Sequence, residues 1–326
     1  SGSGASNQFK GGSSSMSNIH GVHSFNDNGS GGAGGARSGG GRGGYAYAGG
    51  GPEQGFNQQF PIPAGHISLL RVGGGSFPEL CDLFCPRYRL LCFTTFISVV
   101  QCIMLVVCLI VGAEMFDGAF VKGNDMGGPG GQTFLYMGAK YLPDIKEGQV
   151  FRFISPILLH GGILHLASNL FFQCRVGFIF ELRWGLVNYV LIYLLTGLGA
   201  SYFSCLISPK SISVGASGAL FGLTGADLSY LIMNWRYLPN QEKFQELCMV
   251  MCVIIINFLI GMTGSGNIDN SAHFGGLVFG FLIGFALTNI LQPEDPNTKN
   301  YRIGGWASYT ALSVICLPCI FLLNLA

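Results

Sequence analysis

Residues 90–115 read LLCFTTFISVVQCIMLVVCLIVGAEM, a run in which Glu114 is the single charged side chain. An α-helix needs about 20 predominantly apolar residues to cross a bilayer, and this run is long enough. Further apolar segments of similar length follow at 153–174, 185–206, 216–235, 247–263, 271–291 and 306–325. The sequence therefore predicts an all-α fold, a polytopic membrane helical bundle with seven transmembrane helices.

The overall composition agrees with a membrane protein. The chain of 326 residues is 49% hydrophobic and 10% charged, whereas soluble domains carry about 25% charged residues. Its net charge of +1 gives no general attraction to nucleic acid. We therefore expect membrane lipids around the chain and no nucleic-acid partner.

Glycine-rich sequence separates the start of the chain from the apolar segments. Residues 1–60 contain strings such as SGSGASNQFKGGSSSMSN and GGAGGARSGGGRGG, which have too little apolar surface to fold, so a disordered tail is predicted. No apolar core of a signal peptide is visible there. Residues 61–89 form a juxtamembrane segment, 90–291 hold the first six spans, and 292–326 hold a linker and the seventh.

The eleven cysteines do not predict a disulfide scaffold. Most of them lie inside or at the ends of apolar runs, where cysteine behaves as a small hydrophobe. Cys81 and Cys85 form a CxxxC pair ahead of the first span, without a histidine or second cysteine pair at ligand spacing. Reversible palmitoylation is favoured over zinc there, and we predict neither a metal nor a cofactor.

Basic residues indicate the orientation of the chain. They concentrate before the first span and in the connections between spans 2 and 3, 4 and 5, and 6 and 7, namely at Arg71, Arg87, Arg89, Arg175, Arg183, Arg236, Lys243, Lys299 and Arg302. By the positive-inside rule, the N-terminus is cytosolic and the C-terminus lumenal or extracellular. Spans 2, 4 and 6 then all start at the lumenal face.

Those three spans start with polar residues, which are rare and usually functional inside a membrane. Span 2 carries His160, His165 and Asn169, span 4 carries Ser217, and span 6 carries His273. His165 and Asn169 are four residues apart and share a helix face, with His160 one and a half turns earlier. The topology gathers these side chains at one depth.

Serine becomes a nucleophile when a base within hydrogen-bond reach takes its proton, and Ser217 with His273 meets this need. Acyl transfer also requires donors for the developing oxyanion. His160, Asn169 and the N–H group of Ser217 are candidates for this oxyanion hole. Gly215 and Gly218 flank the serine at the start of its helix, and Phe221, one turn on, can stack against the imidazole.

Two acidic residues, Asp227 and Asp269, are candidates for a third catalytic residue. Asp227 lies ten residues after Ser217, about 15 Å along a helix, which is too deep to orient His273 and favours a structural carboxylate over a proton relay. Asp269 is expected in the preceding loop, so a dyad fits better than a triad. Glu181 and Arg183 are expected to form an ion pair at the membrane border.

The motifs resemble those of the rhomboid family of intramembrane serine proteases. The string GASGALFG at 215–222 resembles the GxSG nucleophile motif, H-x-x-x-x-H-x-x-x-N at 160–169 the second-helix signature, AHxxG at 272–276 the sixth-helix base motif, and ELR at 181–183 the ExR motif. The resemblance covers about residues 90–291. The seventh span is similar to the eukaryotic secretase-type arrangement, and the overall character is similar to the apicomplexan rhomboids.

This resemblance implies a six-helix core with a dyad of Ser217 and His273 and an oxyanion hole from His160, Asn169 and the Ser217 amide. It implies cleavage of single-span transmembrane proteins near the lumenal or extracellular border, without metal, in the plasma membrane or a secretory-pathway membrane. The chain departs from many members in having Phe151-Arg152 in place of Trp-Arg, and Phe221 in place of tyrosine.

Two other function classes also place polar residues in membrane helices or share this fold. A transporter or channel typically shows internal repeats of its spans, and none is visible. A non-proteolytic membrane adaptor with the same fold would be expected to lack the serine or the histidine, and this chain has both. An intramembrane endopeptidase is therefore the favoured interpretation.

Overall fold

The computed structural model describes residue 85, residues 87–262 and residues 269–324. The predicted disordered tail, and most of the juxtamembrane segment, lie outside these residues. The elements are α2 (Phe93–Met115), α3 (Gly131–Tyr136), α4 (Leu142–Lys146), the 3₁₀ turns η1 (Val150–Phe153) and η2 (Ser155–Leu158), α5 (Ile163–Trp184), α6 (Leu186–Ile207), α7 (Ser217–Asn234), α8 (Asn240–Met262), α9 (Asn270–Leu287) and α10 (Thr298–Leu322). Apart from one isolated bridge between Lys140 and Ser213, no strand occurs in the described residues. The predicted all-α fold is confirmed.

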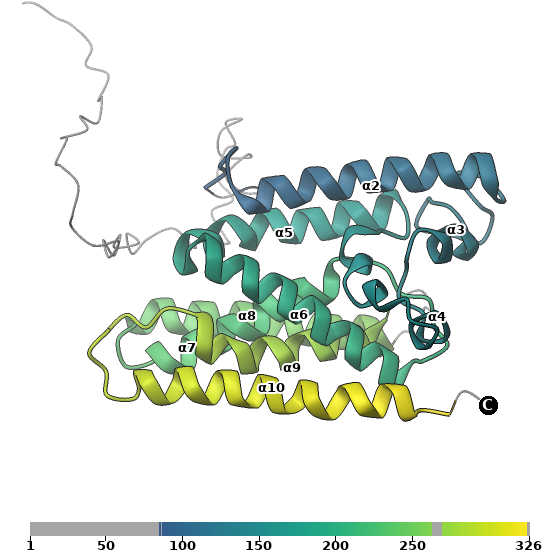
Figure 1. Cartoon of the computed structure of the whole chain (residues 1–326). Helices are drawn as coiled ribbons and strands as arrows, with labels where there is room; N and C mark the ends of the chain where they lie inside the picture. The colour runs from purple at the N-terminus through teal and green to yellow at the C-terminus, as the bar shows by residue number, and fades with distance from the viewer. Residues whose placement is uncertain (1–84, 86, 263–268, 325–326) are drawn as a thin grey trace, which may run out of the picture. The chain divides into compact units, whose positions relative to one another are not determined.

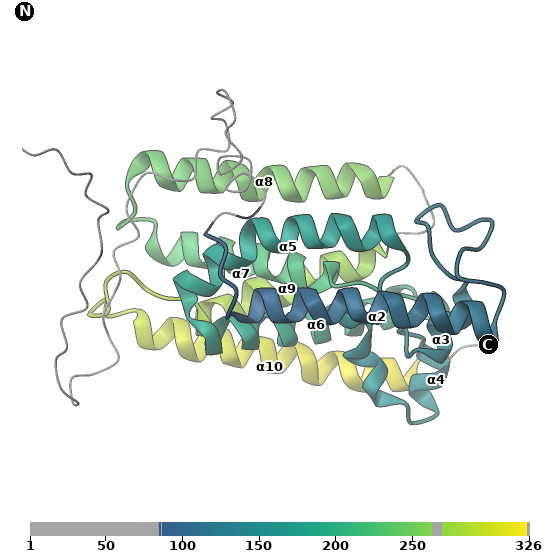
Figure 2. The same cartoon turned by 90° about the horizontal axis from the view of Figure 1, so that it is seen from above.

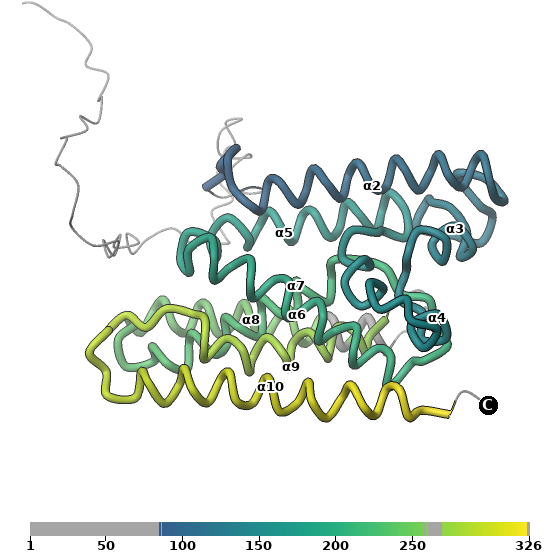
Figure 3. Tube along the Cα trace, in the orientation of Figure 1, coloured from purple at the N-terminus to yellow at the C-terminus, as the bar shows by residue number. Residues whose placement is uncertain are grey.

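The long helices form a layered bundle. Helices α2 and α5 make one layer, α9 and α10 lie on the opposite side, and α6 and α7 lie between them (Figure 1). Seen from above, α8 lies at the edge of the bundle (Figure 2). The connection that contains α3 and α4 lies at the same end of the bundle as the C-terminal end of α10 (Figure 3).

Each of the seven predicted apolar segments overlaps one long helix. Within the described residues, α2, α5, α6, α9 and α10 are long and apolar enough to cross a membrane. In helix α7, most side chains are buried against protein. A helix enclosed by other helices does not need a lipid-compatible surface.

Glycines let α9 lie directly against α7. A methyl group added at Gly276 would lie 2.0 Å from the carbonyl oxygen of Gly218, and one at Gly280 would lie 2.0 Å from that of Gly222. On the other side of α7, a methyl group at Gly222 would lie 2.1 Å from the Cβ of Thr196 in α6. Close approach of this kind is typical of small residues in membrane helices. The predicted central, glycine-rich helix is therefore found in α7.

The predicted start of the second span is wrong by about ten residues. Instead of starting near residue 153, the chain makes two 3₁₀ turns, and α5 starts only at Ile163. Pro156 cannot donate a helical hydrogen bond, and Gly162 adopts a φ of 155°, far from helical values. His160 therefore lies in the connection ahead of α5 and not on its face, while His165 and Asn169 share the first turns of the helix.

The predicted ion pair between Glu181 and Arg183 is also wrong. Glu181 accepts hydrogen bonds from the N–H groups of Phe93 and Thr94, both at 2.9 Å, and from the Thr94 hydroxyl at 2.8 Å. A helix leaves its first N–H groups without intrahelical partners, so Glu181 of α5 satisfies the start of α2. The carboxylate fixes these two helices together.

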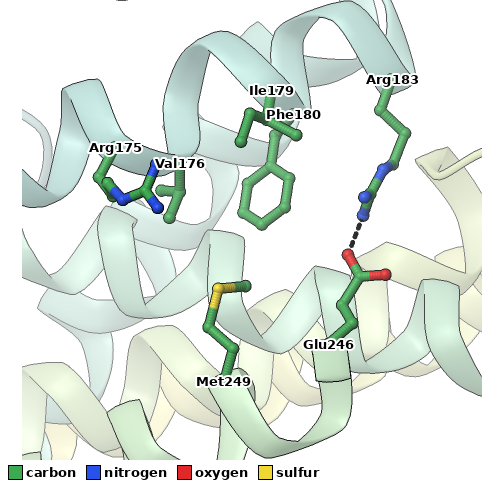
Figure 4. Close-up of a pocket in the computed structure, with 7 residues that line it drawn as sticks. All are labelled: Arg175, Val176, Ile179, Phe180, Arg183, Glu246 and Met249. Carbon is green, nitrogen blue, oxygen red and sulfur yellow. Dashed lines mark hydrogen bonds and ion pairs between the residues drawn. The ribbon is translucent and has the colours of Figure 1, made fainter. Parts of the chain in front are cut away.

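Arg183 instead pairs with two acidic residues on other helices. Its guanidinium lies 2.8 Å from the Asp227 carboxylate of α7 and also contacts Glu246 of α8. Figure 4 shows the pair with Glu246 beside a small pocket between α5 and α8, with Phe180 and Met249 in its lining. The expectation that Asp227 is a structural carboxylate agrees with this arrangement, in which three helices share one buried cation.

Candidate active site

Ser217 and His273 lie together at one end of the bundle. Ser217 is the first residue of α7, and His273 lies in the first turn of α9. The Oγ atom of Ser217 lies 2.7 Å from Nε2 of His273, within the range of a hydrogen bond. The glycine contacts between α7 and α9 explain this proximity. Gly218, which follows Ser217, and Gly276, three residues after His273, touch through backbone atoms.

The ring of Phe221 holds one face of the imidazole. Its centroid lies 4.6 Å from that of His273, and the planes differ by 28°. Phe221 is one helical turn after Ser217, so both side chains lie on the same side of α7. The stacked ring restricts rotation of the imidazole while Nε2 remains directed at the serine.

The segment before Ser217 is held in an unusual backbone conformation. Gly215 has a φ of 129°, and its N–H group donates to the carbonyl oxygen of Pro156 at 2.9 Å. A methyl group at Gly215 would lie 2.9 Å from Cε1 of His165. Glycine is therefore required at this position by both backbone and space.

His165 lies between the connecting segment and the nucleophile. Its Nδ1 accepts a hydrogen bond from the Gly161 N–H group at 3.1 Å, which directs the rest of the ring toward Gly215. The structure thus brings His165 beside Ser217 and His273, as its place in the motif suggested.

The two predicted side-chain oxyanion donors have different surroundings. Asn169 donates from Nδ2 to the backbone carbonyl of His165 at 2.8 Å, while its buried Oδ1 has no hydrogen-bond partner within the described residues. His160 is fully buried, and neither ring nitrogen makes a well-formed hydrogen bond to the described part of the chain. Its ring packs edge-on against that of His165, with centroids 5.4 Å apart.

A large cavity opens at this end of the bundle. Its volume is about 940 Å³, and it is lined by Ser217, His273, His165 and Asn169 together with loop residues from the 121–140 and 207–215 segments. His160 does not line it and lies behind His165. The cavity is large enough to admit an extended peptide segment and water to the serine.

Sequence reasoning missed Lys140 and the capping role of Asp269. Asp269 is the N-cap of α9, where its Oδ1 accepts a hydrogen bond from the Ala272 N–H group at 3.0 Å. Burial tends to raise the pKa of Asp269, but hydrogen bonds from Ser204 and Ser271 and the nearby charge of Lys140 outweigh it and hold this pKa below its usual value. An aspartate just ahead of the apolar segment 271–291 was the available sequence signal for such a cap.

Lys140 is a buried cation on the rim of the same cavity. Its side chain is 1% exposed, and Nζ donates to the carbonyl oxygens of Ser208 and Ser211 at 3.0 and 2.9 Å. Burial lowers the pKa of Lys140, and the charge of Asp269 opposes this shift. No pattern in the sequence marks this lysine, because its partners lie about seventy residues away.

The described residues contain no group of three or more His, Cys, Asp or Glu side chains that could hold a metal ion. The described cysteines are free thiols. Cys81 lies outside the described residues, so palmitoylation of the CxxxC pair stays a prediction.

Comparison with known proteins identifies the family. Residues 147–290 match the Rhomboid domain. The chain is 30% identical over 264 residues to Rhomboid-like protease 1 of Toxoplasma gondii, in an alignment that covers 76% of this chain and 83% of the relative. The chain belongs to the rhomboid family. As a rhomboid family member with several apolar helices, it is a multi-pass integral membrane protein.

Plant rhomboids are more similar over a shorter stretch. RHOMBOID-like protein 5 of Arabidopsis thaliana is 41% identical over 176 residues, which cover 53% of this chain and 55% of the relative. RHOMBOID-like protein 2 is 42% identical over 175 residues, or 53% of each chain. The rhomboid chain thus spans about half the length of these Arabidopsis relatives. The matched domain contains Ser217, His273 and the other predicted site residues.

Proposed function

We propose that this rhomboid is an intramembrane serine endopeptidase in which Ser217 is the nucleophile and His273 its base. The observation that carries the proposal is the distance of 2.7 Å between Ser217 Oγ and His273 Nε2. The name of the Toxoplasma relative, Rhomboid-like protease 1, supports the same class of activity.

The proposed reaction uses two acyl-transfer steps. Ser217 Oγ attacks the peptide carbonyl carbon while its proton passes to His273 Nε2, which then protonates the leaving amine. Water enters through the cavity, loses a proton to His273 and releases the acyl group from the serine. The developing oxyanion requires donors, which we assign to the Ser217 N–H group, Asn169 and His160. Because Asn169 lines the cavity and His160 does not, Asn169 is the side-chain donor that we favour.

The substrate class follows from where the cavity lies. It opens among the loops at the end of the bundle where α5, α7 and α9 begin, so a membrane helix must present an unwound segment near the membrane border. We therefore propose single-span transmembrane proteins as substrates. The basic residues of the other connections support a lumenal or extracellular position for this border by the positive-inside rule.

The test is cleavage in liposomes. Wild type, Ser217→Ala and His273→Ala are reconstituted with a single-span test substrate, and cleavage is followed by gel electrophoresis. A fluorophosphonate probe reports on the serine without any substrate, because Ser217 Oγ forms a bond to phosphorus as fluoride leaves and the proton passes to His273. Ser308→Ala is the matched control, since the Ser308 hydroxyl is exposed and bonded to its own helix at Gly304.

We expect wild type and Ser308→Ala to cleave and to be labelled, and both dyad variants to fall to the background of empty liposomes. His273 accepts a proton only when neutral, so cleavage should decline once the pH falls below the pKa of His273. Full cleavage or labelling of Ser217→Ala would reject this serine as the nucleophile. A wild type that binds the test substrate but neither cuts it nor takes the label would favour a non-proteolytic adaptor.

A further inference from the structure

Asp269 lies four residues before His273. Lys140 forms backbone hydrogen bonds with Ser213, which lies four residues before Ser217. The geometry points to Asp269 as a positioning residue for His273, with the buried Lys140 as the opposite charge on the lining of the same cavity. This inference rests on the proposed function, because it assigns a role in the proton transfer between Ser217 and His273.

Asp269 fixes the first turn of α9 to a neighbouring helix. Its Oδ1 accepts from the Ala272 N–H group at 3.0 Å and from the Ser271 hydroxyl at 2.5 Å, and its Oδ2 accepts from the Ser204 hydroxyl of α6. The N–H group of His273 donates to the carbonyl oxygen of Asp269 at 3.2 Å. The residue that carries the base therefore starts from a turn that is bonded to α6 through one carboxylate.

Lys140 fixes the segment that leads to the nucleophile. Its backbone exchanges two hydrogen bonds with Ser213, Lys140 N to Ser213 O at 2.9 Å and Ser213 N to Lys140 O at 3.1 Å. The side chain holds the carbonyl oxygens of Ser208 and Ser211. Ser217 lies four residues after Ser213, so Lys140 fixes the segment before the serine. Asp269 fixes the segment before the histidine in the same way.

The charges of these two residues act on the same proton transfer. When Ser217 loses its proton to His273, the imidazole becomes positive, and a carboxylate one turn away favours this form. Lys140 has the opposite sign and limits the effect. Among the described residues, the titratable groups near His273 are Asp269, which caps its helix, and His165 from α5, and the charge of Lys140 acts on Asp269.

Two substitutions that remove charges of opposite sign distinguish this electrostatic role from a packing role. Asp269→Asn keeps an acceptor for the Ala272 N–H group and removes the negative charge. Lys140→Met keeps most of the buried side-chain volume and removes the positive charge. Ser204→Ala is the matched control, because it removes one hydrogen bond to Asp269 and leaves both charges.

The readout is the pH dependence of cleavage in liposomes, with kcat and KM measured separately and fluorophosphonate labelling in parallel. Without the Asp269 charge the imidazole is a weaker base. We expect Asp269→Asn to move the acid limb of the profile to lower pH and to reduce kcat by about tenfold, the effect of one pKa unit, with KM unchanged. We expect Lys140→Met to move the same limb to higher pH, and Ser204→Ala to leave its position unchanged.

Superimposable profiles for wild type and Asp269→Asn, with equal kcat, would overturn the inference and leave the proposed dyad intact. Shifts of both variants in the same direction would show a packing effect and would overturn it as well. Loss of labelling together with a fall in thermal stability would show that a variant has misfolded. In that case the direction in which the acid limb of the other variant moves still decides the test. A wild type without cleavage or labelling would reject the proposed function, and this inference with it.

Discussion

At the scale of single residues, the site depends on residues that position the reactive side chains as much as on the reactive side chains themselves. Gly215 allows His165 to lie against the backbone just ahead of Ser217, and Phe221 fills the face of His273 that the serine does not use. Each of these residues acts on the position of a reactive side chain and takes no part in bond making. A substitution that adds a single carbon can therefore act on the chemistry without removing a polar group.

Gly215→Ala is the test at this scale. The alanine would have to adopt a φ of 129° with its Cβ 2.9 Å from His165 Cε1, so the segment before Ser217 must move. We expect a loss of stability of about 1–3 kcal/mol and a loss of fluorophosphonate labelling. Gly148→Ala is the matched control, because Gly148 has a φ of 100° with no atom near its missing side chain. Equal labelling of the two variants would contradict a steric role for Gly215.

At the scale of elements, the contact between α7 and α9 decides whether serine and histidine meet. The two helices touch through backbone atoms at Gly218 and Gly276 and again at Gly222 and Gly280. Since these contacts follow directly after the reactive residues, a change in the distance between the helices is transmitted to the hydrogen bond of Ser217 and His273.

Gly276→Ala should separate these helices. The new methyl group would lie 2.0 Å from the Gly218 carbonyl oxygen, and relief of that clash requires a shift of more than 1 Å, roughly the misplacement that costs a hundredfold in rate. We expect cleavage to fall by about this factor and stability by about 1–3 kcal/mol. Gly304→Ala in α10, where nothing lies within 4 Å, should leave cleavage unchanged. A Gly276→Ala enzyme with wild-type cleavage would show that the close contact is not needed for the dyad.

The sequence contained the apolar runs, the glycines of α7 and α9 and the polar residues at the starts of three spans, because each of these is a local pattern. It could not locate the start of α5, since Pro156 and Gly162 sit within an otherwise apolar run and only the folded chain shows where the helix resumes. It also paired Glu181 with Arg183 because they are neighbours in sequence. In the structure each of these two residues contacts other helices, and Lys140 and Asp269 likewise depend on long-range contacts that no spacing predicts.

At the scale of the whole molecule, the two ends of the bundle have different polar contents. One end carries the cavity and the dyad, and the other carries Arg183, Asp227 and Glu246 on α5, α7 and α8. Because Asp227 and Glu246 are almost fully buried, Arg183 takes the place of water as their partner. The ion group thus ties the edge helix α8 to the centre of the bundle, far from the reactive residues.

Arg183→Met tests this tie. Removal of one partner from a buried ion pair usually costs about 3–5 kcal/mol, because it leaves an uncompensated charge, and here two carboxylates lose their partner. We expect a large fall in the thermal unfolding midpoint in detergent, whereas Arg236→Met, at an exposed position, should change stability by less than about 0.5 kcal/mol. The combined variant Arg183→Met, Asp227→Leu, Glu246→Met removes all three charges and should recover most of the loss, since apolar replacements of buried ion groups are often neutral. If the combined variant were as unstable as Arg183→Met alone, the cost would lie in lost packing and not in unpaired charge, and the group would be a spacer between helices and not an electrostatic tie.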